Sequence, residues 1–296
     1  MIHDSPEELL PIIRSFAPDP KKPVPVGRRE YSAFYQGFQG EAAESARQDR
    51  YEIGPGLQGF LISVPEPATN QVVLFFHGGG FTMGSTDDHL GICARIARAA
   101  RASVFSVDYR LAPENVFPAA ANDAVAAYRY LVANGIRPHR ILPVGISAGG
   151  TLVLDLLIAL RDEGAAMPPA AVCMSPVVDM LFPGESMKKN LERDWLTPAR
   201  LEAMRTQYLV GHDPTDPVAS PANARLSGLP RLYIQAGSHE LLFDSIGTFV
   251  DKTRWAGVPV QFGVWEGMFH CWQMFAEQVP EGGEAIDHIG AFLQSV

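Results

Sequence analysis

Short apolar runs of strand character alternate with longer stretches of helical period from about residue 60 onward. The strand-like runs fall at residues 60–65, 72–77, 103–108, 141–146, 171–175, 231–236 and 259–265. The stretches with apolar residues at helical spacing fall at residues 88–101, 119–134, 150–163, 243–256 and 283–294. Strands that are apolar on both faces and separated by helices predict a mainly parallel sheet covered on both sides, which is an α/β fold.

Two segments interrupt this alternation. Residues 1–50 begin with a predicted helix and continue through a proline-rich stretch, and residues 183–226 contain one helical stretch near 198–210 followed by turn-rich sequence. Long connections without regular structure are uncommon in compact domains and are often functional. We therefore expect these two segments to form a cap and residues 51–296 to form the main domain, with 183–226 inserted into it.

The charge balance narrows the classes of partner. The 296 residues include 24 Lys and Arg against 33 Asp and Glu, a net charge of −9. An acidic chain without a basic stripe is unsuited to neutralising phosphates, so we expect no nucleic-acid binding. No stretch approaches the roughly 18 apolar residues that a membrane span needs, and the acidic N-terminal residues do not resemble a signal peptide.

The cysteines indicate neither a metal cluster nor a disulfide framework. Cys93, Cys173 and Cys271 form no CxxC spacing and are odd in number. We expect free thiols, no metal site and a cytoplasmic location.

The sequence GISAGG carries the strongest chemical signal. A G-x-S-x-G that follows a strand and opens a helix is typical of a nucleophile elbow, a tight turn that lifts the serine hydroxyl above the sheet. Ser147 is the nucleophile in this interpretation, with Gly145 and Gly149 where strand and helix approach closely. An ordinary glycine-rich turn is the alternative.

A second glycine-rich loop, HGGGF, ends the strand at 72–77. Its backbone N–H groups at Gly78, Gly79 and Gly80 could stabilise a developing oxyanion, together with the N–H of Ala148, the residue after the nucleophile. A phosphate-cradling turn is the alternative, although neither GxxxxGK[ST] nor GxGxxG is present. The ring of His77 is expected to brace this loop.

Four motifs in this order resemble one known family. HGGGF, DYRLAPE followed by FPAA, GxSAGG and a late EGMFH are similar to the hormone-sensitive-lipase-like branch of the α/β-hydrolases, the bacterial family IV carboxylesterases. The resemblance covers nearly the whole chain. It implies an eight-stranded α/β-hydrolase catalytic domain with a helical cap, a Ser-acid-His triad and activity on small acyl esters. We expect no cofactor. Dimers are common in the family, so a homodimer is one candidate assembly.

The base is expected to be His270. The triad in this fold follows the chain order Ser, acid, His, so only a histidine well after Ser147 qualifies. His270 stands just beyond the strand at 259–265, in the family's EGMFH motif.

Glu240 and Asp244 compete for the role of the acid. Both follow the strand at 231–236 in the sequence GSHELLFD. The family commonly has D-x-L-x-D here with the first acid catalytic, which favours Glu240, and glutamate can orient an imidazole as aspartate does. The sequence departs from the family again at Ile146, where many members have aspartate.

Other residues have weaker assignments. Asp108 and Arg110, in DYRLAPE, are interpreted as a partly buried structural pair. Four apolar residues are candidates for a pocket that binds the acyl or alcohol group of a substrate, and ordinary packing within the cap is the alternative for each: Phe81, Trp195, Leu196 and Phe269.

The predicted activity is therefore that of a serine carboxylesterase acting on small or short-to-medium-chain acyl esters through an acyl-enzyme. An amidase or deacetylase acting on N-acyl groups would use the same triad. A non-catalytic small-molecule receptor of the same fold is the alternative from another class.

Overall fold

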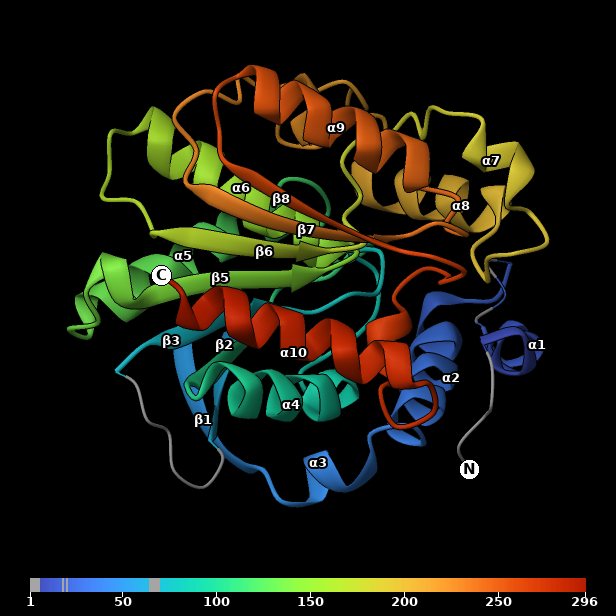
Figure 1. Cartoon of the computed structure of the whole chain (residues 1–296), viewed down its shortest axis with the longest axis horizontal. Coiled ribbons are helices and arrows are strands. Elements are labelled where there is room, and N and C mark those ends of the chain that lie inside the picture. Colours follow the sequence, from blue (N-terminus) through green and yellow to red (C-terminus); the bar gives the residue numbers. More distant parts are fainter. Residues whose placement is uncertain (1–5, 18, 20, 64–69) are drawn as a thin grey trace.

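An eight-stranded, mostly parallel sheet runs through the centre of the protein (Figure 1). The computed structural model describes residues 6–17, 19, 21–63 and 70–296. The strand order is β1-β2-β4-β3-β5-β6-β7-β8. Strand β2 runs antiparallel to both of its neighbours, β1 and β4, and β3 to β8 run parallel to one another. The strands are β1 Arg47–Gly54, β2 Leu57–Ser63, β3 Val72–Phe76, β4 Ser103–Asp108, β5 Ile141–Ile146, β6 Ala170–Met174, β7 Arg231–Gly237 and β8 Val260–Trp265.

The central strands are buried on both faces, as the apolar runs predicted. Every residue of β5 and β6 is buried. The predicted α/β fold is thus confirmed, and each of the seven expected strands overlaps an observed one. Residues 64 and 65, the end of the first expected strand, lie outside the described residues.

The strand β1 has no counterpart among the apolar runs. Its sequence, RQDRYEIG, is largely polar, and its residues are exposed or half-buried because it lies at the edge of the sheet. Since β1 begins at Arg47, the domain boundary expected at residue 50 falls within a strand of the sheet.

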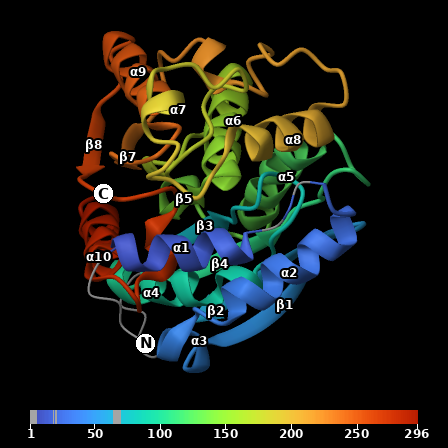
Figure 2. The same ribbon diagram turned by 90° about the vertical axis from the view of Figure 1, so that its right-hand side faces the viewer.

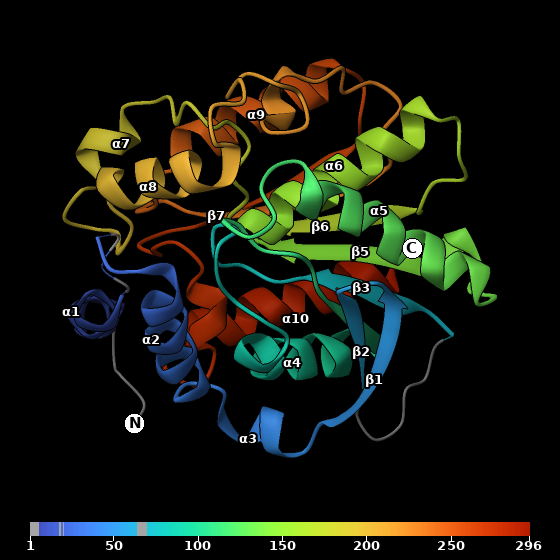
Figure 3. The ribbon, with the colours of Figure 1, turned by 180° about the vertical axis from the view of Figure 1, so that it is seen from behind.

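Helices cover both faces of the sheet (Figures 1 and 3). On one face lie α4 (Leu90–Ala100) and α10 (Pro280–Gln294), which pack on each other and share one apolar cluster with the sheet. On the other lie α5 (Ala119–Ala133), α6 (Ala148–Asp162) and α9 (Phe243–Trp255), whose apolar residues belong to a second cluster. This arrangement buries both faces of the parallel strands.

Helices from the two interrupting segments lie near each other at the carboxyl ends of the parallel strands (Figure 2). The first contributes α1 (Pro6–Phe16) and α2 (Val24–Gln36), and the second contributes α7 (Ser186–Lys189) and α8 (Pro198–Leu209). Helix α8 matches the helical stretch predicted near 198–210, and Thr197 caps its start, since Thr197 Oγ1 accepts a hydrogen bond from Arg200 N at 3.2 Å. The remaining helices are α3 Gly40–Glu44, which packs on α4, and the 3₁₀ helices η1 Asp87–His89, η2 Pro138–Arg140, η3 Pro221–Asn223 and η4 Trp272–Phe275.

The expected ion pair between Asp108 and Arg110 is wrong. Arg110 instead pairs with the buried Asp123, with Arg110 Nη2 and Asp123 Oδ1 2.7 Å apart. Asp108 Oδ1 accepts a hydrogen bond from the backbone N–H of Thr86 at 2.7 Å. The two acids lie on different elements, and Asp123, on α5, faces the guanidinium.

The described residues carry neither a membrane-spanning helix nor a metal-binding cluster. No helix there is both long enough and apolar enough to cross a membrane. The same residues contain no cluster of three or more His, Cys, Asp or Glu side chains that could hold a metal ion. Cys93, Cys173 and Cys271 are all buried free thiols, as expected.

Candidate active site

Ser147 occupies a sharp turn between β5 and α6. Its backbone has φ 55° and ψ −119°, which a non-glycine residue adopts only under strain. The glycines on either side allow the turn. A Cβ on Gly145 would overlap the carbonyl oxygen of Gly149, and a Cβ on Gly149 would overlap that of Phe76. The local sequence thus folds into the predicted elbow because no larger residue fits at either glycine.

Ser147, His270 and Glu240 form one continuous chain of hydrogen bonds. His270 Nδ1 lies 2.9 Å from Glu240 Oε2, and His270 Nε2 lies 2.9 Å from Ser147 Oγ. Since Nδ1 donates its proton to the carboxylate, Nε2 is left to accept from the serine hydroxyl. The three residues come from the loops after β5, β7 and β8, so the parallel sheet brings them to one edge. All three are buried.

The carboxylate of Glu240 is held from its other side. Its Oε1 accepts hydrogen bonds from Ser175 Oγ at 2.8 Å and from the backbone N–H of Gly237 at 2.6 Å. These contacts orient Oε2 toward His270.

Asp244 points elsewhere. It lies in the first turn of α9, where its Oδ2 accepts a hydrogen bond from the backbone N–H of Ser186 at 2.8 Å. Asp244 therefore connects α9 to α7, and the structure brings Glu240, not Asp244, to the imidazole.

The surroundings of His270 favour its charged form. Burial by itself lowers the pKa of the imidazole, but the adjacent Cys271 and the Glu240 carboxylate act against it, and the pKa is raised well above its usual range. An imidazolium is thus stabilised within hydrogen-bond distance of the Ser147 hydroxyl.

The glycines of the loop after β3 line the same cavity as Ser147. Gly79 and Gly80 have φ values of 117° and 61°, and a Cβ on Gly79 would overlap the carbonyl oxygen of Met83. Across the described part of the chain, the N–H groups of Gly79, Gly80 and Ala148 have no protein acceptor. These three N–H groups can therefore donate to a molecule bound at Ser147.

Gly78 differs from Gly79 and Gly80, because its N–H, which was expected to face an oxyanion as theirs do, already has an acceptor in the protein. Its N–H donates to His89 Nε2 at 3.1 Å, so it is not free to bind an oxyanion. The tautomer of His89 is set by its other nitrogen, because Nδ1 donates to the carbonyl oxygen of Ser85 at 3.0 Å. Burial lowers the pKa of His89 to about 3, which keeps the ring neutral and able to accept.

The ring of His77 supports the loop after β3 by a hydrogen bond and by stacking. Its Nδ1 donates to the carbonyl oxygen of Gly78 at 2.7 Å, and its ring stacks on that of Tyr109 with centroids 4.1 Å apart. Tyr109 in turn donates its hydroxyl to the carbonyl oxygen of His77 at 2.9 Å. Burial lowers the pKa of His77 as well, so both histidines support the loop as neutral rings.

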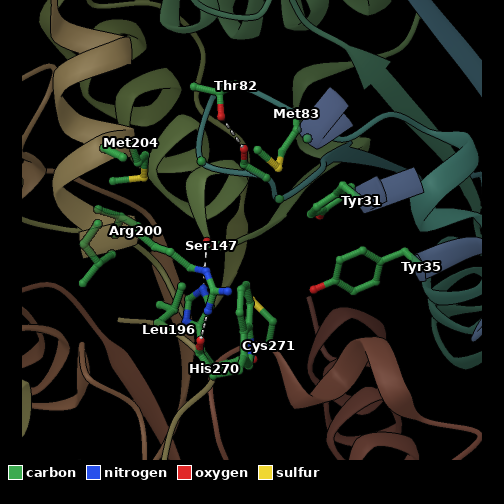
Figure 4. A pocket seen from close by; sticks show the side chains of 18 of the residues that line it. Tyr31, Tyr35, Thr82, Met83, Ser147, Leu196, Arg200, Met204, His270 and Cys271 are labelled. Carbon is green, nitrogen blue, oxygen red and sulfur yellow. Dashed lines mark hydrogen bonds between the residues drawn. The ribbon is translucent and has the colours of Figure 1, made fainter. Parts of the chain in front are cut away.

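A cavity of about 130 Å³ opens onto Ser147 and His270 between the sheet edge and the two interrupting segments (Figure 4). Trp195 and Leu196 contribute to its wall, as expected of pocket residues. The helix α2 contributes Tyr31 and Tyr35, and α8 contributes Arg200. Further apolar residues of the wall are Val24, Met83, Val177, Leu201, Met204 and Met274.

Phe81 and Phe269 do not line this cavity, which corrects the expectation for both. The ring of Phe81 is fully buried and stacks on Tyr208 of α8, with centroids 3.9 Å apart. Phe269 is buried in the third apolar cluster, where its ring contacts Phe275 edge-on at 5.9 Å between centroids. Both rings are packed into the core, so the alternative of ordinary packing holds for them.

Some residues of the site were not found from the sequence. They are His89, Ser175, Asp194 and Cys271, together with the two tyrosines of α2. The spacing of Tyr31 and Tyr35, four residues apart on one helix face, was the one signal available. The others are single side chains whose partners are distant in sequence.

The chain is similar to known proteins by a family match, by sequence relatives and by solved structures. A family described as alpha/beta hydrolase fold matches residues 73–274. An acetyl-hydrolase from Streptomyces hygroscopicus is 42% identical over 232 residues, 78% of each chain. An esterase from Acinetobacter venetianus is 35% identical over 243 residues, 81% of this chain and 80% of the other.

Solved structures resemble the chain over its whole length. An esterase from the bacterial hormone-sensitive lipase family is 40% identical, with a TM-score of 0.93 over 99% of both chains. A hormone-sensitive lipase from a metagenome library is 33% identical, with a TM-score of 0.93 over 100% of this chain and 99% of the other. The chain belongs to the α/β-hydrolase fold family and, within it, to the hormone-sensitive-lipase-like branch of bacterial esterases, as its motifs predicted.

Proposed function

We propose that this protein is a serine carboxylesterase that hydrolyses small to medium acyl esters through an acyl-enzyme. The observation that carries the proposal is the hydrogen-bond chain from Ser147 through His270 to Glu240, with 2.9 Å at each step. A nucleophile, a base and an orienting acid at these distances are the parts that acyl transfer requires.

In the first half of the reaction, Ser147 Oγ attacks the ester carbonyl carbon while His270 Nε2 takes the hydroxyl proton. The carbonyl oxygen becomes an oxyanion, which the N–H groups of Gly79, Gly80 and Ala148 stabilise. The bond to the alcohol oxygen then breaks, and His270 returns the proton to that oxygen. The alcohol departs and the acyl group remains on Ser147.

In the second half, a water molecule attacks the acyl-enzyme. His270 takes a proton from the water, the same N–H groups stabilise the second oxyanion, and the proton returns to Ser147 Oγ as the carboxylic acid leaves. Glu240 holds the imidazole in the required tautomer throughout and stabilises its positive charge.

The two interrupting segments are proposed to act as the cap. About half of the residues that line the cavity come from these two segments, from α2 and its N-terminal side in the first and from residues 195–207 in the second. This wall is mainly apolar and aromatic, which suits an uncharged acyl ester.

The Ser147→Ala variant tests the proposal. Hydrolysis of p-nitrophenyl butyrate should fall by about four orders of magnitude or more, because the variant has no nucleophile. Ser295→Ala is a matched control, since this exposed serine lies at the end of α10, and it should retain full activity. Matched p-nitrophenyl ester and p-nitroanilide substrates would compare ester with amide cleavage.

Two results would overturn the proposal. One is wild-type protein that is folded but turns over no ester in a panel of substrates. The other is a Ser147→Ala variant as active as the wild type. Mass spectrometry after treatment with a fluorophosphonate gives an independent readout, with an adduct expected on Ser147.

A further inference from the structure

Residues 190–196, which we call the clamp segment, hold the two loops that carry Glu240 and His270. The segment belongs to the insertion between β6 and β7. Its first residue, Asn190, is buried and donates from Nδ2 to two carbonyl oxygens, that of Ser238 at 3.0 Å and that of Glu240 at 2.9 Å. The side chain therefore secures the acid loop on both sides of residue 239.

Asp194 connects the acid loop to the base loop. Its Oδ2 accepts the backbone N–H of Leu241 at 2.8 Å, and its Oδ1 accepts the backbone N–H of His270 at 3.0 Å. Oδ1 also lies 3.4 Å from the backbone nitrogen of Leu196. The side chain is completely buried. One carboxylate thus sets the spacing between the residue after Glu240 and His270 itself.

Trp195 completes the hold on His270. Its indole Nε1 donates to the carbonyl oxygen of His270 at 2.7 Å. Consecutive residues of the clamp segment therefore bind both the N–H and the C=O of the proposed base, which leaves its main chain little freedom to rotate.

The clamp segment is itself tied to the N-terminal segment. Arg14, on α1, donates to the carbonyl oxygens of Leu191 at 3.0 Å and of Asp194 at 2.9 Å. Arg200 donates to the carbonyl oxygens of Trp195 at 2.7 Å and of Ala17 at 3.0 Å. Both parts of the proposed cap are thus linked to the triad through this one segment.

Asp194 also brings charge to the site. Burial raises the pKa of its carboxyl to about 6, although the nearby His270 opposes that rise, so the group is mostly ionised above neutral pH. The ionisable groups around it are the His270 imidazole, the Glu240 carboxylate, the Cys271 thiol and, at its backbone, the Arg14 guanidinium. Its negative charge favours the imidazolium form of His270.

We infer that Asp194 is a positioning residue of the proposed esterase, which fixes the distance between the Glu240 and His270 loops and stabilises the positive charge on His270. The inference rests on the proposed function. It assigns to the insertion between β6 and β7 a part in the chemistry besides shaping the cavity.

The test is Asp194→Asn, which keeps the shape of the side chain but removes its charge and one acceptor. We expect kcat for p-nitrophenyl butyrate to fall about 10- to 100-fold while KM changes less than about threefold, because the substrate wall is intact. The acid limb of kcat/KM should move to lower pH by about one unit, since a negative charge near the base is lost.

Two further variants distinguish a specific positioning role of Asp194 from a general loss of structure. Asp123→Asn also removes a buried carboxylate, but one that pairs with Arg110 away from the triad, and it should leave the acid limb in place. Asn190→Leu removes the two hydrogen bonds to the acid loop without a change of charge. It should lower kcat and leave the acid limb unmoved, and it tests the clamp even if Asp194→Asn folds poorly.

An NMR titration of the His270 ring distinguishes failure of this inference from failure of the proposed function. It needs no turnover and can be made in the Ser147→Ala background with and without Asp194→Asn. A lower pKa of His270 in the double variant is the expected result. An unchanged His270 pKa, or an Asp194→Asn enzyme with wild-type kcat and acid limb, would overturn the role of Asp194. Absence of esterase activity in the wild type would overturn the proposed function instead.

Discussion

Glu240 shows how one side chain can be accommodated where the family pattern has an aspartate. The longer side chain reaches His270 Nδ1 at 2.9 Å because Ser175 and the N–H of Gly237 hold its other oxygen. Residue matching within the motif favoured Glu240 over Asp244, and Glu240 is the one that hydrogen-bonds to His270; its role as the triad acid stays a prediction. The contact to Ser175 could not be anticipated, since 65 residues separate the two positions.

Replacing each acid in turn should separate their roles. Glu240→Gln should lower kcat for ester hydrolysis by about 10³- to 10⁴-fold, because the amide neither fixes the tautomer nor stabilises the imidazolium. It should also move the acid limb of kcat/KM to lower pH, since Glu240 raises the pKa of His270. Asp244→Asn is the control, and pH-rate profiles of both variants make the comparison. Equal losses in the two would contradict Glu240 as the triad acid.

His89 provides a second prediction about a single residue. His89→Phe keeps a ring of similar size but leaves the N–H of Gly78 without its acceptor. We expect kcat to fall about 10- to 100-fold, because the neighbouring donors at Gly79 and Gly80 lose their alignment. His139→Phe, at an exposed position, serves as control. If His89→Phe has wild-type kcat and unfolds at the wild-type urea concentration, the oxyanion loop does not depend on this ring.

Among the elements, the strand-turn-helix of β5 and α6 is the one most tightly specified by its sequence. Its glycines are required because the backbones of β3, β5 and α6 nearly touch. The polar edge strand β1 shows the opposite case. It pairs with β2 over most of its length, yet its composition carries no strand signal, because β1 lies at a solvent-exposed edge where charged side chains are common.

Two glycine-to-alanine changes within helices should have opposite effects. Gly149→Ala, in α6, should destabilise the fold by about 1–3 kcal/mol, because its Cβ would overlap the carbonyl oxygen of Phe76. Gly247→Ala, in α9, has no atom within 4 Å of the new Cβ and should stabilise the fold by about 0.5–1 kcal/mol. Urea unfolding of both variants measures the difference. A neutral Gly149→Ala would mean that α6 can move away from β3.

At the scale of the whole molecule, the cavity depends on segments far apart in the sequence. Its wall combines α2, the loop after β3, the insertion between β6 and β7 and the loop after β8. The homodimer expected from the family resemblance stays a prediction, which sedimentation velocity would test.

The size of the cavity predicts a preference among substrates. Its volume of about 130 Å³ is close to that of a cavity of roughly 150 Å³ that accommodates benzene. We expect kcat/KM for p-nitrophenyl esters to be highest for acyl chains of about two to six carbons and to fall steeply beyond about ten, because longer chains cannot be buried. A chain-length series measures this preference. A maximum at the longest chains would show that the acyl group lies outside the cavity.

The sequence by itself determined the layered fold and the turn at Ser147, and it pointed to the glycine loop after β3 and to His270 as the proposed oxyanion loop and base. Each depends on local periodicity, on glycines at sharp turns or on chain order, and these are properties of neighbouring residues. Only the tertiary structure decided that Phe81 and Phe269 are core residues, that Gly78 donates to His89, and that Asp194 joins the two triad loops. Those contacts join residues brought together by the folding of the whole chain, and whether a side chain faces a cavity or the core depends on packing that no local pattern records.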